Sequence, residues 1–356
     1  MTPLGEKLLS RIRAYGPMTV AEYMEACLSD PFYGYYMRRE PFGRYGDFVT
    51  APEVSQMFGE LIGVWTVVVW EAMGSPREFV LAELGPGRGT LMADLLRVVR
   101  VMPDFTRAAR VHLVETSPRL RGIQQSTLAS AGTPIGWHAR VEELPPGPMI
   151  VIANEFFDAL PIRQFRWGAE GWAERMIGIN PNDGFAFFLK PVDQRPLSAL
   201  PDGAIVETSP TAIAITTAIG RRLAASGGAA IFIDYGTDRP GYGDTLQAVR
   251  EHKYAEPLAA PGEADLTAHV DFAALTKAAS EAGANPRPIV GQGAFLNRLG
   301  LGTRATALAE GKDEATRQAV EAAAERLAGP KTMGELFKVL AIGAPGLALP
   351  GFDQAS

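Results

Sequence analysis

The chain has 356 residues, of which 47% are hydrophobic and 21% charged, and it carries a net charge of -6 at pH 7 with a pI of about 5.4. These values predict a globular protein large enough for one elaborated domain or two, and the acidic balance argues against broad binding of nucleic acids. The single cysteine, Cys27, excludes a disulfide framework and a cysteine-based zinc site, and the four histidines lack ligand spacing, so no metal is expected.

Two amphipathic helices are predicted near the start of the chain, over residues 4–15 and 19–27, because apolar side chains recur there at helical spacing. The segment from Asp30 to Tyr36 that follows is dense in aromatic residues. It is either a packed aromatic loop or a lid over a ligand, since aromatic faces attract cations.

A glycine-flanked turn at Asp47 precedes the next predicted helix. Thr50 and Glu53 have the spacing of a capping box, and Pro52 suits a first helical turn. Apolar residues then recur at i, i+3 and i+4 and surround the later part of this helix, so we expect it to lie inside the protein. Capping does not explain Asp47, which indicates either a binding site or a local Asx turn.

The longest apolar run, Val64 to Trp70, is far shorter than the roughly 20 residues that span a bilayer, so no transmembrane segment is expected. No signal peptide is expected at the start of the chain, and the single cysteine favours a reducing compartment.

A strand, a glycine-rich turn and a helix are predicted in the first third of the chain. Residues 80–84 are a buried strand, residues 91–99 are an amphipathic helix, and Gly85, Gly87 and Gly89 lie between them. This order is typical of the cofactor loop of a doubly wound α/β domain. A tight strand-to-helix turn without a ligand would use the same glycines.

The spacing of the glycines indicates which cofactor the turn suits. A dinucleotide fingerprint is G-x-G-x-x-G, whereas this turn is G-x-G-x-G with Glu83 two residues before the first glycine. A carboxylate there repels a pyrophosphate but attracts a cation. S-adenosyl-L-methionine carries an ammonium and a sulfonium and no phosphate, so the sequence favours this cofactor over NAD.

The next predicted strand, residues 111–115, ends in Glu115. In a doubly wound sheet this strand end lies beside the first turn, where a carboxylate can accept from both hydroxyls of a ribose. Alternatively, Glu115 caps the helix predicted from Ser117 to Ala131. His112 lies inside the strand and is expected to be a packed core residue.

A short third strand is expected within residues 136–144, and a fourth at residues 149–153 ends in Asn154, Glu155 and Asp158. Polar groups after the carboxyl end of a parallel strand lie in the crevice where ligands bind. An exposed acidic loop is the alternative, but the apolar side chains in this segment should pack it down.

The remaining chain predicts further elements of the sheet and its insertions. Residues 162–192 predict a β-ribbon with a hairpin signal at Asn182-Asp183-Gly184, and a fifth strand ends in Asp234. Other expected features are a helix at 211–225, a long loop region at 237–269, closing strands at 285–290 and 336–342, a helical insert at about 303–328, and a loosely held tail after Pro345.

Several motifs together resemble the MidA family of methyltransferases. The segment Glu83 to Leu91 resembles motif I of class I S-adenosylmethionine-dependent methyltransferases in general. The more specific motifs are GDFVTAPEVSQMFG (46–59), NEFFDALP (154–161), IDYG (233–236) and DLTAHVDF (265–272). The resemblance runs from about Leu4 to Ile342.

The resemblance implies an α/β fold with a doubly wound, seven-stranded class I methyltransferase sheet whose last strand is antiparallel, with added N-terminal helices, an inserted β-ribbon and a helical insert near the C-terminus. We expect an N-terminal helical cap at residues 1–78, a methyltransferase domain at 79–345 with insertions at about 162–205 and 297–330, and a tail at 346–356.

The mitochondrial members of that family are complex I assembly factors that methylate a protein arginine. The resemblance therefore implies symmetric dimethylation of an arginine on the 49-kDa-type subunit of the respiratory NADH dehydrogenase, so the expected partner is a protein and no nucleic acid is expected. Those members have a targeting extension, whereas this chain starts at the family core, so a bacterial, cytoplasmic protein is expected.

An arginine acceptor needs carboxylates, because its guanidinium is cationic and a poor nucleophile. Carboxylates can bind it by paired hydrogen bonds and accept the released proton. The expected catalytic residues are Glu155 and Asp158, then Asp265, with His269 as a possible proton acceptor and Asn154 to orient substrate or cofactor. The residues expected to bind the cofactor are Glu83, Gly85, Pro86, Gly87, Gly89, Thr90, Glu115, Asp47 and Asn154.

Three other functions are compatible with parts of the sequence. The first is N-methylation of a nucleobase or small molecule, because Asn154 to Phe157 is faintly similar to an N-P-P-Y loop, although both prolines are missing. The second is a non-catalytic assembly factor that uses the cofactor fold as a scaffold. The third, an NAD-dependent oxidoreductase, is disfavoured by the glycine spacing.

Overall fold

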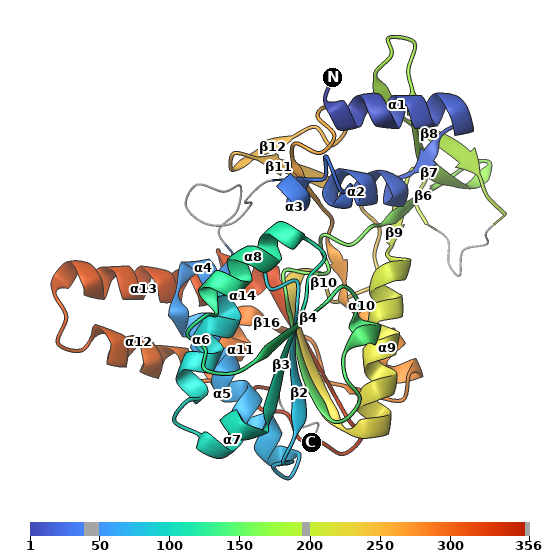
Figure 1. The fold of residues 1–356 in the computed structure, drawn as a ribbon. Coiled ribbons are helices and arrows are strands. Elements are labelled where there is room, and N and C mark those ends of the chain that lie inside the picture. Colours follow the sequence, from blue (N-terminus) through green and yellow to red (C-terminus); the bar gives the residue numbers. More distant parts are fainter. Residues whose placement is uncertain (39–49, 194–199, 353–356) are drawn as a thin grey trace.

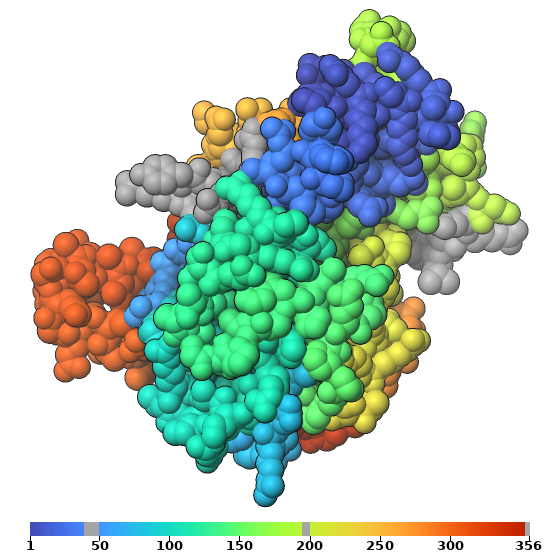
Figure 2. Space-filling model, viewed as in Figure 1, coloured from blue at the N-terminus to red at the C-terminus, as the bar shows by residue number. Residues whose placement is uncertain are grey.

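The computed structural model describes residues 1–38, 50–193 and 200–352. Figure 1 shows a body built on one large sheet and a second lobe above it, which contains the N-terminal helices and a β-ribbon. In the space-filling view the N-terminal helices (blue) cover the upper end of the molecule and a pair of helices (orange) projects from its side (Figure 2). Across the three described ranges, no helix combines the length and the apolar character needed to cross a membrane.

The central sheet confirms the expected doubly wound fold. Its strand order in the described part of the chain is β15-β17-β10-β5-β2-β3-β4, with β14 beside β10 and β16 beside β17. The pairs from β4 to β10 are parallel, and β17 runs antiparallel to β10. The strands are β2 Phe79–Leu84, β3 Ala109–Val114, β4 Ile135–His138, β5 Met149–Asn154, β10 Gly228–Thr237, β14 Val270–Asp271, β15 Asn285–Pro286, β16 Val290–Gly291 and β17 Phe337–Gly343.

Helices cover both faces of this sheet, which explains why its central strands are apolar throughout. Successive residues alternate between the faces: Leu81 and Ile150 join a core with α5, α6 and α7, whereas Ala82 and Val151 join a core with α9 and α10 (Figure 1). The helices of this body are α4 Ala51–Val54, α5 Gln56–Ala72, α6 Thr90–Val99, α7 Pro103–Ala108, α8 Pro118–Thr127, α9 Pro210–Ser226, α10 Phe272–Glu281, α11 Gln292–Arg298, α12 Leu301–Ala309, α13 Glu314–Ala328 and α14 Met333–Leu336, with a 3-10 turn at Val141–Glu143.

A third core joins the N-terminal helices to the predicted β-ribbon. Leu4 and Tyr23 pack with Ile177 and Leu266, and Met18 is the antiparallel partner of Ile177. Within the expected N-terminal cap at residues 1–78, α5 packs in the core of the central sheet, whereas α1 and α2 pack in this third core. The elements of this lobe are α1 Pro3–Tyr15, β1 Met18–Thr19, α2 Val20–Ser29, α3 Tyr35–Arg38, β6 Arg163–Gly168, β7 Gly171–Ile179, β8 Phe185–Pro191, β9 Ile205–Thr208, β11 Gln247–Arg250, β12 Lys253–Ala255 and β13 Asp265–Thr267.

The capping box expected at Thr50 and Glu53 is wrong. The Thr50 side chain makes no cap hydrogen bond, and the helix breaks at Ser55, whose hydroxyl accepts from the N–H of Met57 at 3.2 Å. The Glu53 carboxylate accepts instead from the hydroxyl of Thr90, with Thr90 Oγ1 and Glu53 Oε1 2.6 Å apart. Glu53 therefore pairs with the first residue of α6 and not with the start of its own helix.

Two segments are more ordered than expected. The region 237–269 contains β11, β12 and β13, which form a small antiparallel sheet instead of one long loop. The tail after Pro345 is packed as far as it is described: Leu347, Leu349 and Phe352 are buried, and Trp65 Nε1 donates to the carbonyl oxygen of Pro350 at 3.2 Å. The tail is therefore held by the burial of its apolar side chains, although its described part forms no helix or strand.

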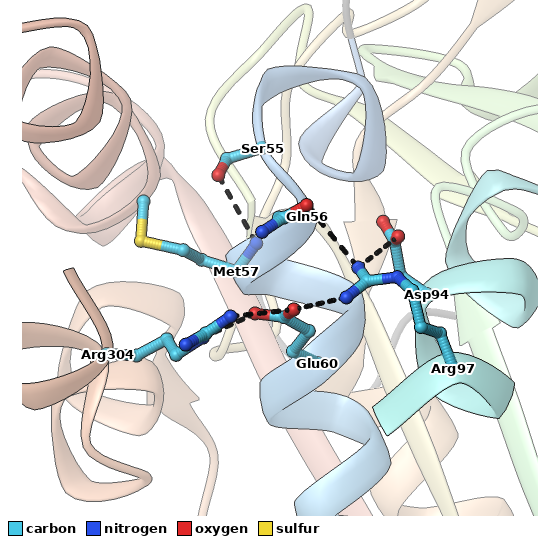
Figure 3. Close-up of polar contacts among 7 residues, drawn as sticks. All are labelled: Ser55, Gln56, Met57, Glu60, Asp94, Arg97 and Arg304. Atoms are coloured by element: carbon cyan, nitrogen blue, oxygen red, sulfur yellow. Dashed lines mark hydrogen bonds and ion pairs between the residues drawn. The ribbon is translucent and has the colours of Figure 1, made fainter. Parts of the chain in front are cut away.

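The helical insert α12–α13 is anchored to the body by a buried carboxylate (Figure 3). Glu60 on α5 is 2% exposed and accepts from Arg97 of α6, at 2.7 Å, and from Nε and Nη2 of Arg304 of α12, at 2.7 and 3.0 Å. Burial alone would raise the pKa of Glu60, but the hydrogen bonds from the two guanidinium groups lower it below its usual value.

Candidate active site

A hollow with a cavity volume of about 40 Å³ lies at the carboxyl edge of the sheet, where the glycine turn after β2, the start of α4 and the end of β5 meet. Because parallel strands end on one edge, residues far apart in the sequence converge there. The hollow is lined by Thr50, Pro52, Glu53, Glu83, Gly85, Pro86, Gly87, Arg88, Thr90, Leu91, Asn154 and Glu155. We call it the cofactor hollow.

The glycine turn needs its glycines for two reasons. Gly85, Gly87 and Gly89 have φ of 60°, 52° and 82°, in the left-handed region that disfavours other residues. In addition, a Cβ on Gly85 would lie 2.7 Å from Cδ2 of Phe156. The aromatic ring thus packs directly on the turn.

Glu83 has a buried carboxyl oxygen that is available to a ligand. Its side chain is 3% exposed and accepts from the backbone N–H of Met92, while Oε2 has no hydrogen-bond partner among the described residues. Burial raises the pKa of Glu83 to about 8. Asn154 Oδ1 is likewise buried and, within the same described part, unpartnered. Two orphaned acceptors around one hollow fit a cationic, hydrogen-bond-donating ligand.

The segment at the end of β5, residues 154–161 (NEFFDALP), is shaped by Asp234 of β10. Asp234 Oδ2 accepts the backbone N–H groups of Phe156, Phe157 and Asp158 at 3.1, 3.0 and 3.2 Å. Glu155 has a φ of 50°, unusual for a residue other than glycine, and such strain is concentrated at functional sites. Asp234 therefore acts as the structural support of this loop.

Glu155 and Asp158 are buried carboxyl groups with raised pKa values. Burial raises the pKa of Glu155 to about 7; the charge of Asp158 adds to this, and a hydrogen bond from the Ala51 N–H, 3.0 Å from Oε1, opposes it. Burial also raises the pKa of Asp158 to about 6, against a hydrogen bond from Tyr235. Both groups therefore ionise close to neutral pH, as a group that binds a cation and exchanges its proton requires.

Asp265 lies near this pair and is bound by a residue that the sequence did not single out. The hydroxyl of Tyr36 lies 3.0 Å from each oxygen of Asp265, and the charges of Asp265 and Asp158 add to the effect of burial in raising the pKa of Tyr36. The aromatic segment at residues 30–36 was the only signal for Tyr36. Its hydroxyl makes the N-terminal lobe part of the acidic site.

Glu115 is placed differently from the other predicted cofactor ligands. It does not line the cofactor hollow; its Oε1 accepts the N–H of Ser117 at 2.8 Å, while the hydroxyl of Ser117 itself caps α8. The fully buried Gln124, which sequence reasoning missed, donates to Glu115 Oε2 at 3.2 Å and to the Gly87 carbonyl at 2.8 Å. Glu115 is thus tied to the back of the glycine turn, and a role toward a ribose stays a prediction.

Among the described residues, Asp265 and His269 do not line the cofactor hollow. His269 is exposed and lies in a neighbouring hollow, with its ring edge-on to Tyr235 at 5.5 Å. Asp47 lies outside the described residues. His112, expected in the core, is half-buried and pairs with His138, Nδ1 to Nε2, at 2.9 Å. No group of His, Cys, Asp and Glu in the described ranges is arranged to bind a metal ion.

Comparison with known proteins agrees with this geometry. The family of S-adenosyl-L-methionine-dependent methyltransferases matches residues 61–290. The human mitochondrial protein arginine methyltransferase NDUFAF7 is 38% identical over 96% of this chain and 83% of its own length, and the Drosophila melanogaster homolog is 36% identical over 99% and 87%. A Burkholderia thailandensis crystal structure bound to S-adenosyl-homocysteine has a TM-score of 0.84 at 29% identity, covering 99% of this chain and 93% of that one.

These matches also correct one expectation. The cytoplasmic location expected from the sequence is wrong by this comparison, because the human, rat and fly relatives are mitochondrial proteins. The resemblance to a methyltransferase family is confirmed over nearly the whole chain. The chain therefore belongs to the family of S-adenosyl-L-methionine-dependent methyltransferases, and S-adenosyl-L-methionine is its cofactor.

Proposed function

We propose that this methyltransferase transfers the methyl group to the guanidinium of an arginine in a protein. The observation that carries the proposal is the pair of buried carboxyls, Glu155 and Asp158, whose pKa values of about 7 and about 6 bring them into charge near neutral pH. The names of the curated relatives support the same acceptor, since they are protein arginine methyltransferases.

The chemistry explains why two carboxyls suit this acceptor. A guanidinium is protonated at any ordinary pH, so its nitrogen has little nucleophilic character until one N–H is polarised. One carboxylate can hold the group through charge-assisted hydrogen bonds while the other accepts the proton lost as the carbon–nitrogen bond forms. We assign both tasks to Glu155 and Asp158, with Asp265 and Tyr36 completing the acidic surroundings.

The cofactor supplies an electrophilic methyl group. Glu83, the glycine turn and Asn154 would bind it, because they contribute the orphaned acceptors and the close backbone approach of the hollow. The N–H groups of loop 154–161 are fixed by Asp234, so the chain orients its acids before the substrate arrives.

A finer form of the proposal names the acceptor. The family resemblance supports symmetric dimethylation of an arginine on the 49-kDa-type subunit of respiratory complex I, in support of its assembly. The test is incubation of the protein with methyl-labelled S-adenosyl-L-methionine and a cell extract, followed by mass spectrometry of the labelled residue. Label on an arginine of a protein is the expected result; label only on a nucleobase or a small metabolite would contradict it.

The role of Asp158 is tested with the variant Asp158→Asn, which keeps the size of the side chain and removes its charge. This variant should still bind S-adenosyl-homocysteine and should transfer at least about a hundredfold more slowly, as expected for loss of a general base. If Asp158→Asn labels the same arginine at the wild-type rate, Asp158 has no role in the chemistry, and the assignment of the acceptor is unaffected.

A further inference from the structure

A second and larger hollow, with a cavity volume of about 260 Å³, lies on the other side of loop 154–161. It is formed where α9 and α10 begin, by the loop after β10 and by the segment between β13 and α10. We call it the acceptor groove. Neither the glycine turn nor Glu83 lines it, so it is distinct from the cofactor hollow.

The acceptor groove is one layer of side chains away from the catalytic acids. Its wall residue Ala268 donates its N–H to the carbonyl oxygen of Asp158 at 3.0 Å. Another wall residue, His269, packs edge-on against Tyr235, and Tyr235 donates a hydrogen bond to the Asp158 carboxylate. Phe157 forms a third part of the wall. It directly follows Glu155, which lines the cofactor hollow, and Phe156, which packs on Gly85. A chain bound in the groove would therefore lie one layer of side chains away from the buried Asp158 carboxyl.

The charge of the groove favours a cationic occupant. Two carboxylates, Glu207 and Asp271, line it, and its lining residues, all within the described chain, include no lysine or arginine. Glu207 is held by the N–H and hydroxyl of Thr245 and by Gln164. The partial positive charge at a helix N-terminus repels a cation, and both α9 and α10 begin at the groove. Ser209 caps α9, and the carboxylate of Asp271 both caps α10 and counters its partial charge.

The groove also offers apolar surface that nothing in the described structure covers. Ile213 on the first turn of α9 is 38% exposed, and Tyr242 on the loop after β10 is 56% exposed. Such side chains at the rim of a groove suit the aliphatic stems of long basic residues and the apolar neighbours of a bound strand.

We propose that the acceptor groove binds an extended, positively charged segment of the acceptor protein, flanking the arginine that enters the site. This inference rests on the proposed function and adds to it where the acceptor binds and what sequence surrounds the modified residue. The chain's own net charge of -6 favours the same partner through long-range attraction.

The test reverses the charge at one exposed position of the groove. Ile213→Lys and Ile213→Glu introduce long side chains of opposite charge, and the control is Val64→Lys, at an apolar position on α5 that is 43% exposed and lies outside both hollows. Binding of fluorescein-labelled peptides of about ten residues, which extend over roughly 33 Å at about 3.3 Å per residue, is measured by anisotropy in the presence of S-adenosyl-homocysteine. The peptides have a central arginine and lysine, serine or glutamate flanks.

The wild-type protein should prefer lysine flanks over glutamate flanks. Ile213→Lys should weaken binding of the lysine-flanked peptide roughly fivefold or more, Ile213→Glu should retain or strengthen it, and Val64→Lys should behave as wild type. All variants should keep their affinity for S-adenosyl-homocysteine. Equal peptide affinities for Ile213→Lys and Ile213→Glu, or no wild-type preference among flanks, would overturn the groove assignment.

A parallel assay with methyl-labelled S-adenosyl-L-methionine separates this inference from the proposed function. Charge-dependent binding without label on the arginine would leave the groove in place and refute arginine transfer. Label on the arginine, together with binding that does not depend on the charge at position 213, would support arginine transfer and refute the groove.

Discussion

Replacing Glu83 by Gln keeps the shape of a buried side chain in the cofactor hollow and removes its ability to carry a negative charge. Burial raises the pKa of Glu83 from 4.5 to about 8, so the folded protein keeps this proton over a pH range in which the unfolded chain loses it. The contribution of Glu83 to folding is therefore intact below the unfolded pKa and is lost as the pH rises toward the folded one.

The size of the effect follows from the two pKa values. Each unit of difference corresponds to about 1.4 kcal/mol, so the free energy of unfolding should fall by about 3 kcal/mol between roughly pH 5 and pH 8 because of Glu83 alone. Gln has no such dependence. The difference in unfolding free energy, Glu83→Gln minus wild type, should thus rise by the same amount over that range, measured by urea unfolding without ligand.

Ligand binding should change in the opposite direction. The ammonium group of S-adenosyl-homocysteine pairs with a carboxylate better than with an amide, and loss of such a charged hydrogen bond weakens binding by about 1.5–3 kcal/mol. Glu83→Gln should therefore bind this ligand roughly tenfold to a hundredfold more weakly in calorimetry near pH 8. Glu78→Gln, on the surface with a side chain 68% exposed, is the control and should change neither quantity.

The combination distinguishes a binding group from a structural one. A Glu83→Gln protein whose stability relative to wild type rises with pH, but which binds S-adenosyl-homocysteine as wild type does, would show that the carboxylate is buried for another reason. A stability difference that stays flat across the pH range would instead refute the reasoning from burial.

Three further changes have expected outcomes. Gly85→Ala should abolish S-adenosyl-homocysteine binding in calorimetry, because φ is 60° and the Cβ meets Phe156; partial recovery in Gly85→Ala with Phe156→Ala would identify the ring as the obstacle. The transfer rate should rise with pH through about 6 to 7 and then level off as Asp158 and its neighbour ionise; a rate that falls over this range would contradict their role as bases. Glu60→Gln should lower the unfolding free energy by about 2 kcal/mol in urea, since two guanidinium groups lose their buried partner; an unchanged midpoint would show the ion pairs to be neutral.

Much of the fold could be predicted because its signals are local. A strand buried on both faces is apolar in every residue, as in 80–84, and an amphipathic helix repeats its apolar residues every three or four positions, as in 91–99. The left-handed turns at Gly85, Gly87 and Gly89 depend only on the backbone of the residue concerned. Since parallel strands share one carboxyl edge, the meeting of Glu83 with Asn154 and Glu155 also followed from the order of strands.

The partners of individual side chains could not be predicted in the same way. Glu53 has a local capping position within reach, but its carboxylate accepts from Thr90, 37 residues away. Tyr36 and Asp265 are separated by 229 residues and meet only because the N-terminal lobe packs over the carboxyl edge of the sheet. Such choices depend on which competing donor the packed chain brings closest.

The sequence by itself determined the class of the sheet, the glycine turn and the set of acids at its edge, because each follows from the spacing of residues within one or two elements. Only the tertiary structure decided which acids face the cofactor hollow. It turned Glu115 toward Ser117 and Gln124, placed Phe156 on Gly85, and opened a second groove beside Asp158. The physical reason is that a buried carboxylate takes whichever donor satisfies it in the packed chain, and that donor is fixed by contacts between distant segments.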